Sequence, residues 1–253
     1  MGKIIAIFNQ KGGVGKTTTC INLAAALGAK GKNTLLVDVD PQGNTTGGVG
    51  INKSELEYST YDMLINKVPA RAILTETGFK NLAILPANMN LAGAELELAE
   101  KEGRNFVLKK AISSLAAEFD FLIIDCPPSL GLLSLNALVA ADTVIVPLQC
   151  EYFALEGLSQ LVGTIRTVKQ HYNEHLELEG VLFTMYDSRL KLTTQVVEEV
   201  EKYFPNKVYK TMIPRSVKVA EAPGFGKPII YYEKYSKASF AYKKIADEII
   251  ENS

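Results

Sequence analysis

Short, mostly apolar runs recur along the chain and alternate with longer stretches in which apolar residues return every three or four positions. The short runs cover residues 4–8, 34–39, 82–86, 121–124, 141–148, 178–185 and 208–213. An apolar run of this length, bounded by turn residues, indicates a strand that is buried on both faces. The longer stretches have the period of an α-helix with one apolar face.

The order of these elements predicts the fold class. Helices are expected at residues 20–27, 61–65, 70–74, 91–99, 104–119, 155–172, 193–204 and 237–251. Strands that alternate with helices favour an α/β fold with a doubly wound, mostly parallel sheet and helices on both faces. The 253 residues suit one such domain, spanning residues 1–253.

Some local details of this prediction are less regular. Glycines at positions 47, 48 and 50 predict a loop after the second strand. The last helix is expected to bury Phe240, Ile245 and Ile249 as one stripe. His171 and His175 are four residues apart and could share a helical face, but no third ligand lies near them in sequence. We therefore interpret them as ordinary surface histidines.

Composition and charge narrow the class of protein. Hydrophobic residues make up 47% of the chain, as in globular proteins, and the net charge is −1, which by itself gives no sign of nucleic-acid binding. From Arg166 to Lys244, however, there are 14 basic and 9 acidic residues, a local excess of five positive charges. This excess is compatible either with a phosphate-contacting face or with ordinary solvated helix faces.

The lack of a recognisable targeting segment and the cysteine spacing predict a cytoplasmic protein. No apolar run is long enough to span a bilayer, and the first strand begins too early to leave room for a signal peptide. Cys20, Cys126 and Cys150 are far apart and form no C-x-x-C pair, which argues against an iron–sulphur carrier. We expect all three to be buried thiols in a reducing compartment, and no membrane association.

A glycine-rich segment at residues 9–18 connects the first strand to the first helix. Strand, glycine turn and helix start together form an anion site, because consecutive N–H groups and the helix dipole point at one spot. Lys16 can reach phosphate oxygens, and the Thr17 hydroxyl can bind Mg²⁺. The common phosphate-loop pattern has glycine where this chain has Gln10, and it lacks the second lysine, Lys11. The sequence thus brings two cations to one triphosphate.

Carboxylates follow two of the apolar runs. Asp38 and Asp40 end the run at 34–39, and Pro41 breaks the strand, so that Asp40 is expected in the loop near the terminal phosphate. Asp125 ends the run at 121–124 and is expected to hold Mg²⁺ opposite Thr17, as in a Walker B strand. A buried aspartate there without a metal would be costly.

The segment from Lys11 to Thr18 resembles the deviant Walker A loop of the ParA/MinD family of ATPases, and most of all the loop of chromosomal ParA-type partition proteins. The resemblance implies a P-loop NTPase that uses ATP and Mg²⁺, with Lys11 reaching the nucleotide of a second subunit. It implies catalytic roles for Lys11, Lys16 and Asp40. The implied nucleotide contacts are Lys11, Gly12, Gly13, Val14, Gly15, Lys16, Thr17, Thr18 and Asp38.

Other segments carry the same resemblance. Residues 127–131 resemble the switch that senses the terminal phosphate, and residues 149–154 resemble a stretch at the dimer interface. Pro214 and Arg215 are the candidates for contact with the adenine. Arg189 matches a DNA-binding position, and Lys218 stands where some relatives have arginine. Plain surface charges are an equally good interpretation of these two residues.

The resemblance leaves three functions open. The first is a nucleoid-associated ATPase of DNA segregation, whose ATP-dependent homodimer binds double-stranded DNA non-specifically and is stimulated by a ParB-type partner. The second is a MinD-like ATPase at the membrane, which Glu248 and Glu251 in the last helix oppose. The third is a nucleotide-gated binding module with negligible hydrolysis, which Asp40 beside Lys11 opposes.

Overall fold

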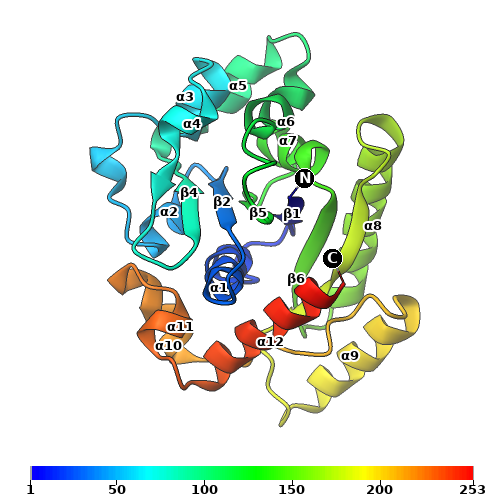
Figure 1. Ribbon diagram of the computed structural model, residues 1–253. Coiled ribbons are helices and arrows are strands. Elements are labelled where there is room, and N and C mark those ends of the chain that lie inside the picture. The colour runs from blue at the N-terminus through cyan, green and yellow to red at the C-terminus, as the bar shows by residue number, and fades with distance from the viewer. Residues whose placement is uncertain (1, 253) are drawn as a thin grey trace.

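The computed structural model describes residues 2–252, and its centre is a seven-stranded sheet with the order β3-β4-β2-β5-β1-β6-β7 (Figure 1). All neighbouring strands are parallel except the β3–β4 pair. The strands are β1 (Lys3–Ile7), β2 (Thr34–Asp38), β3 (Thr75–Glu76), β4 (Leu82–Leu85), β5 (Phe121–Asp125), β6 (Thr143–Gln149) and β7 (Glu177–Thr184).

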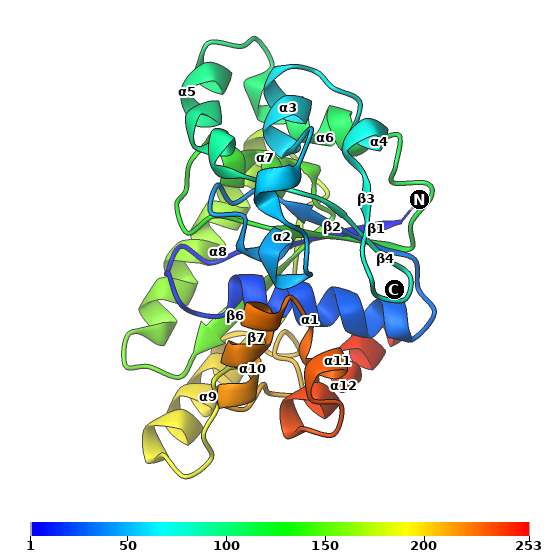
Figure 2. The ribbon, with the colours of Figure 1, turned by 90° about the vertical axis from the view of Figure 1, so that its left-hand side faces the viewer.

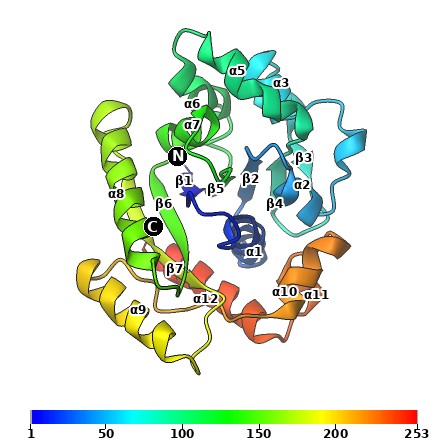
Figure 3. The same cartoon turned by 180° about the vertical axis from the view of Figure 1, so that it is seen from behind.

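Helices cover both faces of this sheet, as the sequence predicts. One face carries α1 (Lys16–Ala29), α10 (Val217–Glu221), α11 (Ile229–Tyr232) and α12 (Lys237–Glu251). The other carries α3 (Thr60–Ile65), α4 (Ala70–Ile73), α5 (Ala94–Ala99), α6 (Val107–Ile112), α7 (Leu132–Ala140), α8 (Ala154–His171) and α9 (Lys191–Tyr203). Figure 2 shows α3–α7 and α10–α12 on opposite sides, and Figure 3 shows α8 and α9 beside the β6–β7 edge.

The apolar run from Ile4 in β1 to Phe8, directly after the strand, is buried on both faces of the sheet. Side chains alternate between the two faces of a strand. Ile5 and Ile7 pack under α1 and α12, whereas Ile4, Ala6 and Phe8 pack under the helices of the other face. Both faces are therefore core, and a polar residue at any of these positions would be buried.

The register of the central strands places three chain segments at one edge. Ile7, the last residue of β1, lies opposite Asp125, and Asp125 lies opposite Asp38 on β2. The glycine-rich segment starts directly after β1. It therefore emerges beside both aspartates at the carboxyl edge of the sheet, where open α/β folds bind ligands.

The predicted strand at residues 208–213 is wrong as a regular strand. The segment runs along β7 but forms only isolated parallel bridges, Val181 with Val208 and Tyr186 with Pro214. Between them, the N–H groups of Lys210 and Thr211 donate to the carboxylate of Glu248 on α12, both at 3.1 Å. A ladder cannot continue through amides that are bonded elsewhere.

Two other expectations about local structure are corrected. Residues 47 and 48 end a short helix, α2 (Asn44–Gly48), and are not part of a loop. Gly48 sits against α1, where a Cβ would lie 2.3 Å from the Ile21 side chain, so close packing explains this glycine. The helix expected at 104–119 is a 3-10 turn (Arg104–Phe106) followed by α6, which ends at Ile112.

Two of the three residues in the stripe predicted on α12 are in the core. Ile245 and Ile249 are fully buried, but Phe240 is 50% exposed, and Tyr242 fills the core instead. Tyr242, Ile245 and Ile249 follow the three-to-four spacing of one helical face, and Phe240 lies about 200° around the helix from Tyr242. Among the cysteines, Cys20 and Cys126 are buried as expected, while Cys150 is only half-buried. No helix within residues 2–252 has the length and apolar character to cross a membrane.

Candidate nucleotide-binding site

The glycine-rich loop has the backbone geometry of an anion cradle. Gly13 and Gly15 have φ of 75° and 90°, values that side chains other than glycine rarely adopt. Gly15 is the N-cap of α1 and offers no side-chain cap to the first-turn N–H groups. These N–H groups and the positive end of the helix dipole are therefore available to phosphate. Gly12 is exposed and Val14 is buried, and Thr18 lies in the first turn of α1.

Lys16 lies inside the cradle. Its side chain is largely buried, and its Nζ donates to the backbone oxygen of Lys11 at 3.0 Å, across the loop. Burial lowers the pKa of Lys16, and the nearby Asp125 carboxylate acts in the opposite direction. A buried ammonium held by one carbonyl is well placed to bind the phosphate oxygens of a nucleotide.

Lys11 points elsewhere. Its side chain is about half exposed, and its Nζ forms an ion pair with Glu151, two residues after β6. The backbone N–H of Lys11 donates to Asn9 Oδ1 at 3.0 Å, which fixes the main chain but leaves the side chain at the surface. Lys11, Glu151 and Phe153 line a cavity of about 370 Å³ beside the loop.

Asp125 and Thr17 form a candidate magnesium site. The Thr17 hydroxyl donates to Asp125 Oδ2 at 2.7 Å, and the Thr45 hydroxyl donates to the same oxygen at 2.6 Å. Asp125 is fully buried, and within residues 2–252 its Oδ1 has no hydrogen-bond partner. An orphaned buried carboxylate oxygen beside a phosphate loop fits Mg²⁺, which binds proteins through few carboxylates and keeps several waters.

Asp38 anchors the loop that follows it. Its Oδ1 accepts the Asp40 N–H at 3.2 Å, and its Oδ2 accepts the Thr46 N–H at 2.9 Å and hydroxyl at 2.7 Å. Burial raises the pKa of both Asp38 and Asp125. The neighbouring Asp125 carboxylate raises the pKa of Asp38 further. Two adjacent buried carboxylates repel each other, so a bound cation would be stabilising here.

Asp40 lies in a tight turn after β2. It is 8% exposed, and its Oδ1 accepts the Gln42 N–H at 2.9 Å. Its backbone oxygen accepts the Gly43 N–H at 2.9 Å, which closes the turn. Lys16 lies close enough for the Asp40 carboxylate to affect the pKa of its ammonium. The structure thus brings Lys16, Asp125 and Asp40 together.

Comparison with known proteins identifies the family. A family model described as an AAA domain matches residues 2–178. The chain is 54% identical over 252 residues to the sporulation initiation inhibitor protein Soj of Bacillus subtilis (strain 168), covering 100% of both chains. It is 52% identical over 250 residues to the chromosome partitioning protein ParA of Myxococcus xanthus (strain DK1622), covering 99% of this chain and 88% of the relative. The chain belongs to the ParA/MinD family.

A solved structure of the same fold carries nucleotide. It is described as a cobyrinic acid a,c-diamide synthase from Mycobacterium smegmatis with bound ADP and magnesium. The TM-score is 0.87 and the identity 41%, over 100% of this chain and 95% of that one. The predicted fold class is confirmed, and the ADP and magnesium in the related structure agree with the predicted cofactors.

In this ParA/MinD chain, the predicted adenine contacts lie on a segment joined to the phosphate loop. The Arg215 N–H donates to the Tyr186 oxygen at 3.2 Å, which places residues 214 and 215 beside the end of β7. That end is bonded to the loop, because the Thr184 hydroxyl donates to the Val14 oxygen at 2.7 Å. Gln149, the last residue of the neighbouring β6, also donates from Nε2 to the Gly13 oxygen at 2.8 Å. Pro214 and Arg215 therefore stay candidates for a wall of the nucleotide site.

The two predicted DNA-binding residues are exposed, and each is paired with a local carboxylate. Arg189 donates to both oxygens of Asp187, from Nε at 2.9 Å and from Nη2 at 2.6 Å. These hydrogen bonds lower the pKa of Asp187 to about 2. Lys218 lies 3.0 Å from Glu221 on α10. Both cations are on the surface, and a phosphate would compete with these carboxylates.

Sequence reasoning missed Thr45, Thr46 and Glu151, which contact the predicted site residues. A signal existed for the threonines, since two hydroxyl residues follow the Asp40 turn, where phosphate and metal ligands gather. The two histidines form no metal site. His171 Nδ1 lies 2.9 Å from the Thr167 oxygen, and within residues 2–252 no group of three or more His, Cys, Asp or Glu residues could hold a metal ion.

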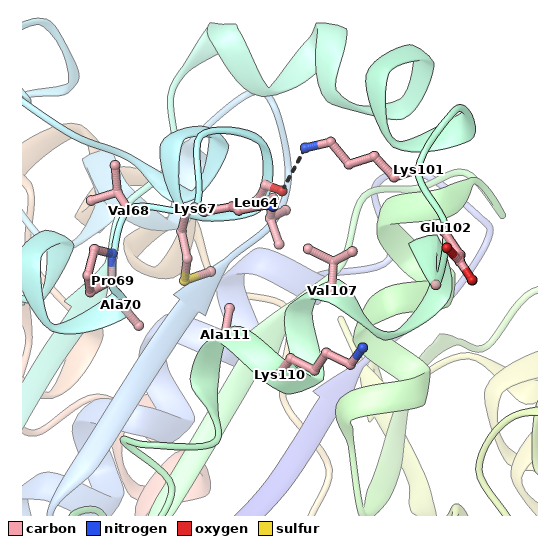
Figure 4. A pocket seen from close by; sticks show the side chains of 12 residues that line it. Leu64, Lys67, Val68, Pro69, Ala70, Lys101, Glu102, Val107, Lys110 and Ala111 are labelled. Atoms are coloured by element: carbon pink, nitrogen blue, oxygen red, sulfur yellow. Dashed lines mark hydrogen bonds between the residues drawn. The ribbon is translucent and has the colours of Figure 1, made fainter.

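A larger cavity lies away from the phosphate loop. It measures about 620 Å³ and opens between α3 and α6, with Leu64, Val107 and Ala111 among its apolar walls (Figure 4). Lys101 bridges its rim by donating to the Ile65 oxygen at 2.8 Å. None of its lining residues belongs to the glycine-rich loop or the strand ends that carry the aspartates. We therefore do not assign it to the nucleotide.

Proposed function

We propose that the chain is a magnesium-dependent ATPase that acts as a switch in chromosome or plasmid partition. The observation that carries the proposal is the Thr17–Asp125 hydrogen bond beside the glycine-rich loop, with Asp125 Oδ1 unpaired within residues 2–252. The 52% identity to a chromosome partitioning protein supports the partition role. The diamide synthase named above is less similar, at 41% identity.

ATP binding would use groups that are already in position. The N–H groups at the start of α1 and the Lys16 ammonium would hold the phosphates. Thr17 and Asp125 would hold Mg²⁺, which supplies positive charge that neutralises the developing charge on the phosphate oxygens. Asp40, in its closed turn, would orient the attacking water and accept its proton. The catalytic contribution of these residues is positioning and electrostatics.

ATP would also dimerise the chain. In our proposal, Lys11 leaves Glu151 and reaches the phosphates bound by a second copy, so that ATP contributes contacts that ADP cannot make. The face around Lys11 suits an interface, because Tyr152 and Phe153 are 80% and 70% exposed and their rings pack edge to face. Exposed aromatic residues are enriched at interfaces.

The ATP-bound dimer would bind DNA through the basic C-terminal third, with Arg189 and Lys218 among the contacts. Such contacts reach the phosphate backbone and carry no sequence preference. A ParB-type partner would stimulate slow hydrolysis and release the dimer from the nucleoid. The MinD-like alternative is less favoured, because the carboxylate of Glu248 on α12 is bonded to Lys210 and Thr211 of the domain.

The test combines hydrolysis with DNA binding. We expect phosphate release from ATP that requires Mg²⁺ and stops with EDTA, and a shift of non-specific double-stranded DNA in a low-salt gel with ATP but not with ADP. Liposome co-sedimentation with ATP serves as the control for the membrane alternative. Absence of magnesium-dependent hydrolysis would reject the enzyme, and absence of a DNA shift would reject the DNA-binding role.

A further inference from the structure

The short helix α2 contacts the carboxyl ends of β2 and β5 and carries two adjacent threonines that are fully buried. The Thr45 hydroxyl donates to Asp125 Oδ2 at 2.6 Å. The Thr46 hydroxyl donates to Asp38 Oδ2 at 2.7 Å. Adjacent residues of one helix are thus bonded to two different carboxylates, which stand opposite each other on neighbouring strands.

The two threonines have different hydrogen-bond partners and therefore different roles. Thr46 is an anchor of the backbone, because its N–H also donates to Asp38 Oδ2 and its Oγ1 accepts the Ala87 N–H at 2.9 Å. Thr45 is instead bonded to the carboxylate that we assign to magnesium. It shares Oδ2 with Thr17, the other residue of the candidate magnesium site, and Oδ1 has no hydrogen-bond partner within residues 2–252.

Backbone hydrogen bonds join the helix that carries Thr45 to the Asp40 turn. The Gly47 N–H donates to the Gly43 oxygen at 3.0 Å, and the Gly43 N–H donates to the Asp40 oxygen at 2.9 Å. The helix has only five residues, and Gly43, its N-cap, is the residue bonded to Asp40. Thr45 therefore lies on an element that contacts both the Asp125 carboxylate and the Asp40 turn.

We propose that Thr45 is a positioning residue that couples the magnesium carboxylate Asp125 to the Asp40 turn. This inference rests on the proposed ATPase function. With Mg²⁺ held at Asp125, the Thr45 hydroxyl would keep α2 and the Asp40 turn in position relative to that carboxylate. Without the hydroxyl, nucleotide still binds, but Asp40 is no longer held where the attacking water stands.

The test compares Thr45→Val, which removes the hydroxyl at nearly the same shape, with Thr45→Ser, which keeps it. We expect Thr45→Val to lower kcat about tenfold while the KM for ATP changes less than about twofold, the effect of one lost hydrogen bond in the transition state. Thr45→Ser should return kcat to within about twofold of wild type. The matched control is Thr60→Val, because Thr60 on α3 is equally buried and its hydroxyl has no partner within residues 2–252.

Hydrogen exchange of residues 40–48 gives a readout that is independent of turnover. With ADP present, adding Mg²⁺ should slow exchange in wild type, Thr45→Ser and Thr60→Val, and should leave it unchanged in Thr45→Val. If Thr45→Val does not fold, Thr45→Ala replaces it in both assays.

Three results would overturn the proposal. One is a wild-type kcat in the variant without the hydroxyl, another is an equal defect in Thr45→Ser, and the third is wild-type exchange of residues 40–48 that does not respond to Mg²⁺. A wild-type protein that hydrolyses no ATP, yet shows the exchange difference between Thr45→Val and Thr45→Ser, would reject the proposed function and keep the coupling.

Discussion

Lys11 forms an ion pair with Glu151, although the two residues are 140 positions apart in the chain. Both side chains are about half exposed, so the pair contributes little to folding. Its consequence is positional: it holds the Lys11 ammonium at the surface beside the two exposed aromatic residues that follow Glu151. In the proposed dimer, this ammonium has to exchange Glu151 for the phosphates of a second nucleotide.

Glu151→Gln should therefore favour dimerisation. Removing the carboxylate charge frees Lys11, so that the ATP concentration for half-maximal dimer formation should fall about two- to fivefold, the range of an exposed ion pair. Light scattering during an ATP titration measures this. Glu156→Gln is the matched control, because Glu156 lies on α8, close to Glu151 in sequence, and its carboxylate accepts from Gln160 at 3.5 Å and not from Lys11. An unchanged or higher requirement for ATP in Glu151→Gln would contradict the prediction.

Asp125→Asn separates the effect of the carboxylate on stability from its proposed role in binding Mg²⁺. The substitution removes one of two adjacent buried charges and keeps an oxygen that accepts from Thr17 and Thr45. We expect the nucleotide-free protein to melt about 2–4 °C higher, which corresponds to about 1 kcal/mol for a chain of this size. The additional stabilisation that Mg²⁺ gives to the ADP complex should disappear.

The matched control for that experiment is Glu174→Gln, whose side chain is 85% exposed in the native protein and should leave both melting temperatures unchanged. A nucleotide-free Asp125→Asn protein that melts below wild type, and that still responds to Mg²⁺, would show that Asp125 is structural and does not bind the metal.

The strand ends that carry the aspartates could be predicted from sequence because a buried parallel strand is a continuous apolar run and its last polar residue marks the ligand edge. The cradle could be predicted because glycine spacing dictates backbone geometry. The pairing of Thr45 with Asp125 could not be predicted, since the two residues are 80 positions apart in the chain and only the fold brings them together. The pairing of Lys11 with Glu151 was missed for the same reason, since 140 positions separate the two residues.

Each element that was not correctly predicted from the sequence has a local physical explanation. Helix α7 is apolar on nearly all sides and has no polar face, so its sequence lacks the helical period that identifies a surface helix. The segment at 208–213 has the composition of a strand, but two of its backbone N–H groups donate to the carboxylate of Glu248 instead of to a neighbouring strand. Phe240 is apolar, but it does not lie on the side of α12 that carries Ile245 and Ile249. Tyr242 occupies the core position instead.

Asp187→Asn should strengthen DNA binding. The neutral amide cannot retain the Arg189 guanidinium, which is then free to bind phosphate. We expect a few-fold higher affinity in a low-salt gel with ATP, while Arg189→Gln should weaken binding and reduce the slope of affinity against salt by about one.

Glu118→Gln controls for the change in net charge in the Asp187→Asn experiment. Glu118 is paired with Arg71 on α4, near the top of Figure 1, whereas α9 lies near the bottom. This control should leave DNA binding unchanged. Equal effects of Asp187→Asn and Glu118→Gln would mean that net charge, and not Arg189, explains the affinity.

Gly28 on α1 is required by close packing. A Cβ at this position would lie 2.4 Å from the Lys80 oxygen, which is a backbone atom and cannot turn away. Gly28→Ala should lower the free energy of unfolding by about 1–3 kcal/mol, measured by chemical denaturation without nucleotide. Gly163→Ala on α8, where a Cβ would meet no heavy atom within 4 Å, should raise it by about 0.5–1 kcal/mol. Equal effects at the two glycines would contradict this account of the packing.

The most direct test of the central claim, an ATP-dependent pair of chains linked through Lys11, is the solution mass of Asp40→Ala with ATP and Mg²⁺. The substitution removes the carboxylate that we assign to water activation, so the ATP-bound state should accumulate. Light scattering should then give twice the 27.6 kDa chain mass, and adding Lys11→Ala should return the single-chain value. A single-chain mass for Asp40→Ala with saturating ATP, or a dimer that persists without Lys11, would contradict the account.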